Sequence, residues 1–197
     1  MHIADGIVAT EICIAADILV LGTVYALSRK VENEDIPRMG LTGAALFAVS
    51  LIHFPLAGTS LHLGLFGLAG LLLGFKVIPV VLAALILQAL IFQHGGLLSV
   101  GLNTINMGLG ALAGWLVWKS GKRFMTLRAF AVGLVGVIIP AGLMAVEFEL
   151  SGYGKGIYYI AGLYLLAGIV EGVITSAAVA FFIKFNIGFP EVYGHEI

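Results

Sequence analysis

The chain has a single cysteine, Cys13, among its 197 residues, and it has few charged residues of either sign. One cysteine excludes a disulfide framework and any metal site built from several cysteines. Ten lysines and arginines stand against eleven aspartates and glutamates, so no excess of charge points to a nucleic acid or to another charged partner. Charged residues make up 11% of the chain, well below the level of about 25% in soluble domains.

Apolar residues fill the space that charged residues leave. They account for 60% of the chain, and the mean hydropathy is +1.10. A chain of this length has no interior large enough to bury so much apolar surface, so we expect a lipid bilayer around it. This composition excludes a soluble enzyme and a disordered tail. We expect a single all-α, polytopic membrane domain that spans residues 1–197.

Seven apolar stretches, separated by polar or glycine–proline breaks, predict seven transmembrane helices. They cover residues 7–27, 41–54, 61–73, 77–92, 102–118, 129–146 and 157–183, within a bundle of residues 7–183. The second and third stretches are short for a hydrocarbon layer of about 30 Å. We therefore expect residues 55–60, which include Thr59 and Ser60, to dip into the membrane. Non-helical backbone at that depth must be buried in protein or line a cavity, so this segment is a candidate site.

Basic residues predict the orientation of the bundle. Nine of the ten lysines and arginines fall in the odd-numbered connections or in the tail at 184–197, and Lys155 alone falls in an even-numbered connection. Cytoplasmic loops carry the excess of basic residues, so we expect the N-terminus outside and the C-terminus in the cytoplasm. Because Glu11 and Asp17 interrupt the first span and no basic segment precedes it, we expect no cleaved signal peptide.

Three pairs of glycines recur at four-residue spacing, at 70 and 74, 110 and 114, and 168 and 172. Small residues at this spacing let helix backbones approach closely in lipid. We expect these pairs to pack helices inside the bundle rather than to form a docking face for a partner.

Four of the five histidines converge on the outer side in this topology: His2, His53, His62 and His94. Histidine is the commonest metal ligand, and imidazole suits zinc, copper, iron and nickel. The alternative for any single histidine is a hydrogen bond to water or a carbonyl at the interface. We favour this alternative for His94 taken alone and for His195 in the tail.

The first two residues form a candidate chelate. Met1 and His2 with a free amine offer three nitrogens: the α-amine, the His2 backbone nitrogen and the His2 imidazole. Cu(II) and Ni(II) accept square-planar nitrogen sites, and one further histidine would complete four nitrogens. Asp5 and Gly6 form a turn that can fold these residues back into the bundle. The alternative is that Met1 is only the start residue and His2 is solvated.

Acidic residues inside the spans need partners. Asp17 and Glu171 lie near the middle of their spans and Glu11 lies about one turn in, where a charge costs about 2.5–3.5 kcal/mol. No basic residue lies within the spans, so these acids must be protonated or hydrogen-bonded, with Asn103, Thr104, Asn106 or a tyrosine as candidate donors. They form either an ion path or a polar network that fixes helix register, and for Glu171 we favour the network.

Several motifs resemble those of the CbiM/NikM proteins, the substrate-binding membrane components of energy-coupling-factor uptake systems for cobalt and nickel. MHIADG at 1–6 resembles their MHIxDG start, and GTSLHL at 58–63 resembles their GTSxHL motif. QHGGL at 93–97 is similar to their glycine loop, and GLNTINM at 101–107 is similar to their GxNxxNM stretch. Glu171-Gly172 resembles their EG pair. The motifs occur in family order and cover nearly the whole chain.

The resemblance implies a seven-helix fold with an outer metal site. Its ligands would be the Met1 amine, the His2 backbone nitrogen and imidazole, and the His62 imidazole. His53 would orient His62 or its loop. Two residues depart from the family pattern: Ala4 replaces a common proline or methionine, and His94 stands where small, acidic or apolar residues are usual. His94 is therefore a candidate for an extra, weak ligand.

The resemblance also implies a role and partners. The chain would bind Ni²⁺, or next Co²⁺, as transported substrate in a prokaryotic inner membrane. It contains no G-x-x-x-x-G-K-[ST] motif, so we expect no bound nucleotide and no ATPase activity. A coupling membrane protein, cytosolic ATPase subunits and a small accessory membrane subunit are the expected partners. Two alternatives are a stand-alone cation channel or facilitator with an outer histidine filter, and a purely structural membrane subunit.

Overall fold

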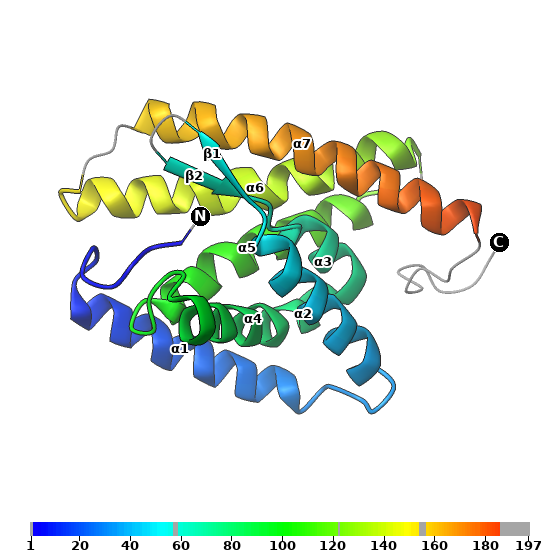
Figure 1. Cartoon of the computed structure of the whole chain (residues 1–197). Helices are drawn as coiled ribbons and strands as arrows, with labels where there is room; N and C mark the ends of the chain where they lie inside the picture. The colour runs from blue at the N-terminus through cyan, green and yellow to red at the C-terminus, as the bar shows by residue number, and fades with distance from the viewer. Residues whose placement is uncertain (1, 57–58, 122, 154–156, 186–197) are drawn as a thin grey trace.

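The computed structural model describes residues 2–56, 59–121, 123–153 and 157–185, and these form a nearly all-helical bundle (Figure 1). The helices are α1 (Thr10–Ser28), α2 (Ile36–Ser50), α3 (Phe66–Leu73), α4 (Val77–Phe92), α5 (Val100–Lys119), α6 (Met125–Leu150) and α7 (Ile157–Lys184), with a short 3-10 turn η1 (Gly74–Lys76). Two strands, β1 (His53–Leu56) and β2 (Thr59–His62), form an antiparallel hairpin.

Five stretches of the described residues are long and apolar enough to cross a membrane. They are α1, the stretch from α3 through α4 (Phe66–Phe92), α5, α6 and α7. Helix α2 is apolar but has only 15 residues. The chain is therefore an integral membrane protein with several spanning helices, while the count of seven spans and the orientation stay predictions.

The structure corrects the expected second and third spans. Helix α2 ends at Ser50, and residues 61–73 do not form one helix, because β2 runs to His62 and α3 begins only at Phe66. Leu65 has φ +50°, in the left-handed region, and so interrupts regular secondary structure between β2 and α3. The all-α expectation is wrong at this hairpin. Pro55 is tolerated in β1 because both strands of a two-stranded hairpin are edge strands.

The helices run back and forth between two ends of the bundle. In Figure 1, α1 begins on the side where α6 ends, and α7 ends on the opposite side, where α1 ends and α2 begins. The N-terminal segment folds back from the start of α1 toward the hairpin, through a turn at Asp5 and Gly6, which has φ +85°. The expected turn is thus confirmed.

Glycines lie where α3, α5, α6 and α7 approach most closely. A Cβ atom on Gly70 would lie 1.8 Å from the carbonyl oxygen of Ala111 in α5. A Cβ on Gly110 would lie 2.7 Å from Pro140 in α6, and one on Gly172 would lie 2.8 Å from Phe130. The glycine pairs therefore serve packing within the bundle, as the sequence predicts.

We expect Gly70→Ala to destabilise the protein strongly, because its methyl group collides with backbone rather than with a flexible side chain. Overpacking of this kind costs about 1–3 kcal/mol or more. Gly142→Ala on α6 is the matched control, because nothing lies within 4 Å of its added Cβ. Thermal unfolding in detergent measures both variants, and equal melting temperatures for the two would contradict the packing described.

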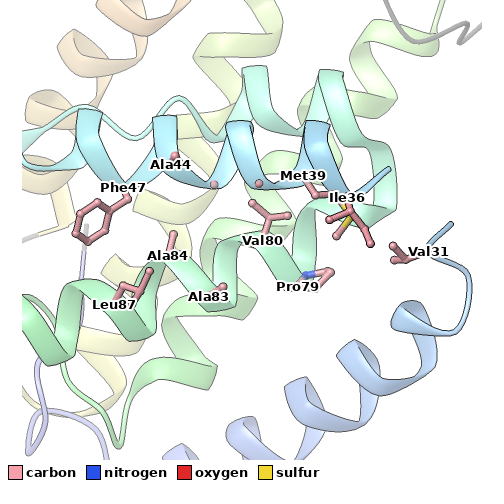
Figure 2. A pocket seen from close by; sticks show the side chains of 12 residues that line it. Val31, Ile36, Met39, Ala44, Phe47, Pro79, Val80, Ala83, Ala84 and Leu87 are labelled. Atoms are coloured by element: carbon pink, nitrogen blue, oxygen red, sulfur yellow. The ribbon is translucent and has the colours of Figure 1, made fainter. Parts of the chain in front are cut away.

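An apolar groove of about 550 Å³ lies between α2 and α4. Figure 2 shows the side chains of α2 facing those of α4 across it. Its lining is entirely apolar: Val31, Ile36, Met39, Gly40, Gly43, Ala44, Phe47, Pro79, Val80, Ala83, Ala84 and Leu87. Near the groove, an ion pair between Lys76 and Asp35 joins the beginnings of α4 and α2. The hydrogen bond from Lys76 holds the pKa of Asp35 below its usual range.

Candidate metal site

Three histidines from separate parts of the chain meet at one place. His2 comes from the N-terminal segment, His62 from the end of β2, and His94 from the loop between α4 and α5. One potential ligand atom from each lies within 4.8 Å of the others. Two nitrogens on one ion lie at most about 4.2 Å apart for bonds of about 2.1 Å, so the cluster needs to close only slightly to bind a metal ion.

The rings of the three histidines contact one another. The centroids of His2 and His62 lie 4.7 Å apart with ring planes inclined by 21°. His94 lies 4.3 Å from His2 and 5.1 Å from His62, with its plane nearly perpendicular to both. His62 is 2% exposed, and its Nδ1 lies 3.3 Å from the carbonyl oxygen of Leu63. A proton on Nδ1 would leave the Nε2 lone pair for a metal ion.

The glycine loop makes room for the N-terminal segment. Gly95 has φ +83°, and a Cβ atom there would lie 3.4–3.6 Å from the side chain of His2. A Cβ atom on Gly96 would lie 1.8 Å from the Asp5 carboxylate. Glycine is therefore required at 96 for Asp5 to approach, and it is the natural residue at 95 because of the positive φ.

Hydrogen bonds hold the backbone of the N-terminal segment in place. Asn103 on α5 accepts from the Ile3 amide at 2.8 Å and donates to the Ile3 carbonyl at 2.9 Å. Ser99 donates a second hydrogen bond to that carbonyl at 2.7 Å. Ile3 is fully buried, and Asn103 and Ser99 are buried with it. These contacts fix the backbone of Ile3, the residue that follows His2. They thereby restrict the position of the His2 imidazole.

Asp5 completes this anchor at the start of α5. Its carboxylate accepts hydrogen bonds from the amides of Leu98 and Ser99, at 3.3 and 2.9 Å, and from the Ser99 hydroxyl at 3.0 Å. The first amides of a helix lack partners within the helix and favour negative charge. Asp5 is therefore a cap for α5 that comes from a distant segment, as well as a turn residue.

Glu171 supports the segment that follows His62. Its carboxylate is fully buried in α7 and accepts from the amides of Gly64 and Leu65, the first at 2.5 Å and the second at 3.0 Å. These amides precede α3, two and three residues after His62. Glu171 thus links α7 to the segment that follows His62 through these two hydrogen bonds.

Two further acids within the helices, Asp17 and Glu147, also have defined partners. Asp17 accepts a hydrogen bond from the Gly101 amide at 2.7 Å. Asn106 donates to Glu147 at 2.7 Å. The side-chain donors expected for Asp17 and Glu171 are therefore wrong, because backbone amides at the starts of α5 and α3 take that role. Glu11 lies in the first turn of α1 and is exposed.

Some predicted site residues cannot be placed in this cluster. Met1 and His195 lie outside the described residues, as does Gly58, the first residue of the GTSLHL motif. His53 lies opposite His62 in the hairpin register, and Thr59 and Ser60 lie in β2 before His62. Sequence reasoning missed Ser99 and Glu147 altogether. The signal for Ser99 is its place just before α5, where small polar residues often lie.

Comparison with known proteins relates this site to metal transport. A family profile described as "Cobalt uptake substrate-specific transmembrane region" matches residues 2–188. The cobalt transport protein CbiM of Sorangium cellulosum is 31% identical over 203 residues, covering 92% of this chain and 90% of that protein. The fused nickel transport protein NikMN of Rhodobacter capsulatus is 30% identical over 162 residues, covering 75% of this chain but only 47% of that longer protein.

The fold agrees with these sequence matches. A crystal structure described as that of a transition metal transporter superposes with a TM-score of 0.85 at 25% identity, covering 95% of each chain. The relatives are named as transport proteins rather than as enzymes. The profile match over nearly the whole length, on a helical membrane bundle with three converging histidines, shows that this chain belongs to the CbiM family of cobalt and nickel transport proteins.

Proposed function

We propose that the chain binds one divalent transition-metal ion, nickel first and cobalt next, and presents it for uptake. The observation that carries this proposal is the meeting of His2 and His62, from segments 60 residues apart in the sequence, with ligand atoms within 4.8 Å. Buried side chains fix the backbone next to both histidines. Asn103 binds the backbone of Ile3 beside His2, and Glu171 binds the backbone of Leu65 after His62.

The proposed ligands are the Met1 amine, the backbone nitrogen and imidazole of His2, and the imidazole of His62. Four nitrogens in one plane favour nickel over cobalt. The set requires a free α-amine at Met1 and loss of the proton from the His2 amide. The anchored Ile3 supports it, because a fixed third residue holds the backbone next to His2, whose ring contacts that of His62.

The proposed ion enters from the outer side of a prokaryotic inner membrane. The described basic residues support this orientation, because they lie at helix ends away from the histidine cluster: Arg29 and Lys30 follow α1, Lys119 ends α5 and Lys184 ends α7. Since basic residues mark the cytoplasmic face, the histidines lie at the opposite, outer end.

Single cysteines, one after the C-terminal end of α5 and one after the C-terminal end of α6, test this orientation. In a Cys13→Ala background, we expect Ser120→Cys to react only from the cytoplasmic side and Ser151→Cys only from outside. Both serines are exposed and follow helix ends, so both thiols are accessible. The measurement is labelling by a membrane-impermeant maleimide in sealed vesicles of known sidedness. Labelling of both positions from the same side would contradict the topology.

Uptake of the metal ion against its concentration gradient needs an energy source. In the proposal, proteins other than this chain supply that energy. A separate membrane coupling protein and cytosolic ATPase subunits, with a small accessory membrane subunit, would use ATP to move the ion. The support is the lack of a P-loop motif in the sequence and the transport names of the relatives.

Metal analysis of the purified full chain tests the proposed function. Metal-free protein with its native N-terminus is incubated with equal nickel and cobalt, separated from free ions and analysed for bound metal. We expect one ion per chain, with nickel in excess. Absence of both metals would contradict the proposal, and metal flux through liposomes containing this chain alone would favour a facilitator instead.

A further inference from the structure

His94 reaches the histidine cluster independently of the two segments that carry His2 and His62. Its ring centroid lies 4.3 Å from that of His2 and 5.1 Å from that of His62. Its potential ligand atom lies within 4.8 Å of theirs. An ion held by His2 and His62 would therefore have a third imidazole at hand.

Local backbone structure fixes His94 in this position. Helix α4 ends at Phe92, and Gln93 follows in the left-handed region with φ +52°. The His94 amide then donates to the carbonyl oxygen of Gln88 at 3.2 Å, which closes the end of the helix. Gln88 is itself buried and donates from its side chain to Ser50 on α2 at 2.6 Å. The way in which α4 ends therefore places His94 at the cluster.

The direction of His94 differs from that of the other two rings. The planes of His2 and His62 are inclined by 21°, whereas His94 makes angles of 78° and 79° with them. In the proposed ligand set, Met1, His2 and His62 fill all four positions of a plane. A fifth nitrogen has only an apical position left.

We propose that His94 is the fifth, apical ligand of the bound ion and that it narrows the preference for nickel over cobalt. This inference rests on the proposed function. Nickel(II) is satisfied by a planar set of four nitrogens, whereas cobalt(II) gains more from a fifth ligand. Planar four-coordinate nickel(II) is diamagnetic, and an apical imidazole makes it high-spin and paramagnetic. His94 therefore controls both the affinity for cobalt and the magnetic state of bound nickel.

Two substitutions of His94 separate ligation from packing. His94→Ala removes the ring, while His94→Phe keeps an aromatic ring against His2 and His62 but has no nitrogen. Leu97→Ala is the matched control, because Leu97 is half exposed in the same loop and takes no part in the cluster. The full chain with its native N-terminus is titrated with Ni²⁺ and Co²⁺, and the magnetic susceptibility of the nickel-loaded protein is measured.

We expect both His94 variants to bind cobalt at least about tenfold more weakly, because even a group that only supports a metal ligand contributes about 10–100-fold to affinity. Their Kd for nickel should change less than about threefold, and bound nickel should become diamagnetic. Leu97→Ala should match the wild type. Paramagnetic nickel and unchanged cobalt affinity in His94→Phe would overturn the proposal, as would an equally large loss of both metals. A wild type that binds neither metal would instead refute the proposed function itself.

Discussion

A histidine-free tag of several residues left uncleaved before Met1 is expected to abolish high-affinity nickel binding although every histidine is still present. The tag turns the Met1 amine into an amide and moves the free amine several residues away from His2, whereas a single added residue would place His2 third and allow a new chelate of amine, backbone nitrogens and imidazole. The proposed chelate of the Met1 amine with the backbone nitrogen and imidazole of His2 is then lost. The described structure restricts any rearrangement, because Ile3 is held by Asn103 and Ser99. Metal-dependent thermal stabilisation provides the measurement.

The size of this effect makes it easy to detect. A ligand at a thousandfold excess over its Kd stabilises the folded state by about 4 kcal/mol, so loss of the site removes a large shift in melting temperature. The matched control carries the same tag at the C-terminus and keeps the native N-terminus. Undiminished nickel binding in the N-terminally extended protein would refute the chelate and leave a site of histidine side chains alone.

His62→Ala is expected to weaken nickel binding by more than about 100-fold. Even changes to groups that only support a metal ligand cost about 10–100-fold, and the proposal makes His62 a direct ligand. The side chain is buried, so its removal also leaves a cavity. Melting of the metal-free variant is therefore measured beside binding, to separate loss of a ligand from loss of the fold.

His53→Ala is the companion variant, because the hairpin register places residue 53 directly opposite residue 62. If His53 only orients its neighbour, its substitution costs no more than the 10–100-fold of a supporting group. Equal losses in the two variants would show that the roles are assigned wrongly. Wild-type affinity in His62→Ala would remove His62 from the site.

The sequence was sufficient to predict the membrane bundle, because hydropathy reports directly on the solvent around a helix. It was less informative where the chain leaves regular structure. Residues 61–73 are apolar apart from His62, yet they contain the end of β2, a left-handed Leu65 and the start of α3. Hydropathy cannot distinguish these states, since an apolar residue is buried equally well in each.

The candidate site shows a similar division. His2 and His62 follow from motifs, but the contact of His94 depends on how α4 ends and on the glycines at 95 and 96. The hydrogen-bond donors to the acids within the helices also could not be predicted from the sequence. Asp17 and Glu171 bind backbone amides at the starts of α5 and α3, and every residue except proline carries such a donor. Residue type therefore does not reveal which amide will be used.

X-ray absorption of the nickel-loaded wild type tests the central claim most directly, since it reports the atoms bound to the ion. The account predicts one nickel per chain, surrounded by nitrogen ligands that include the imidazole scattering expected from His2, His62 and His94. This signal should weaken in His62→Ala protein loaded at high nickel concentration. A coordination shell of oxygen atoms without imidazole, or the same spectrum in the variant, would contradict it.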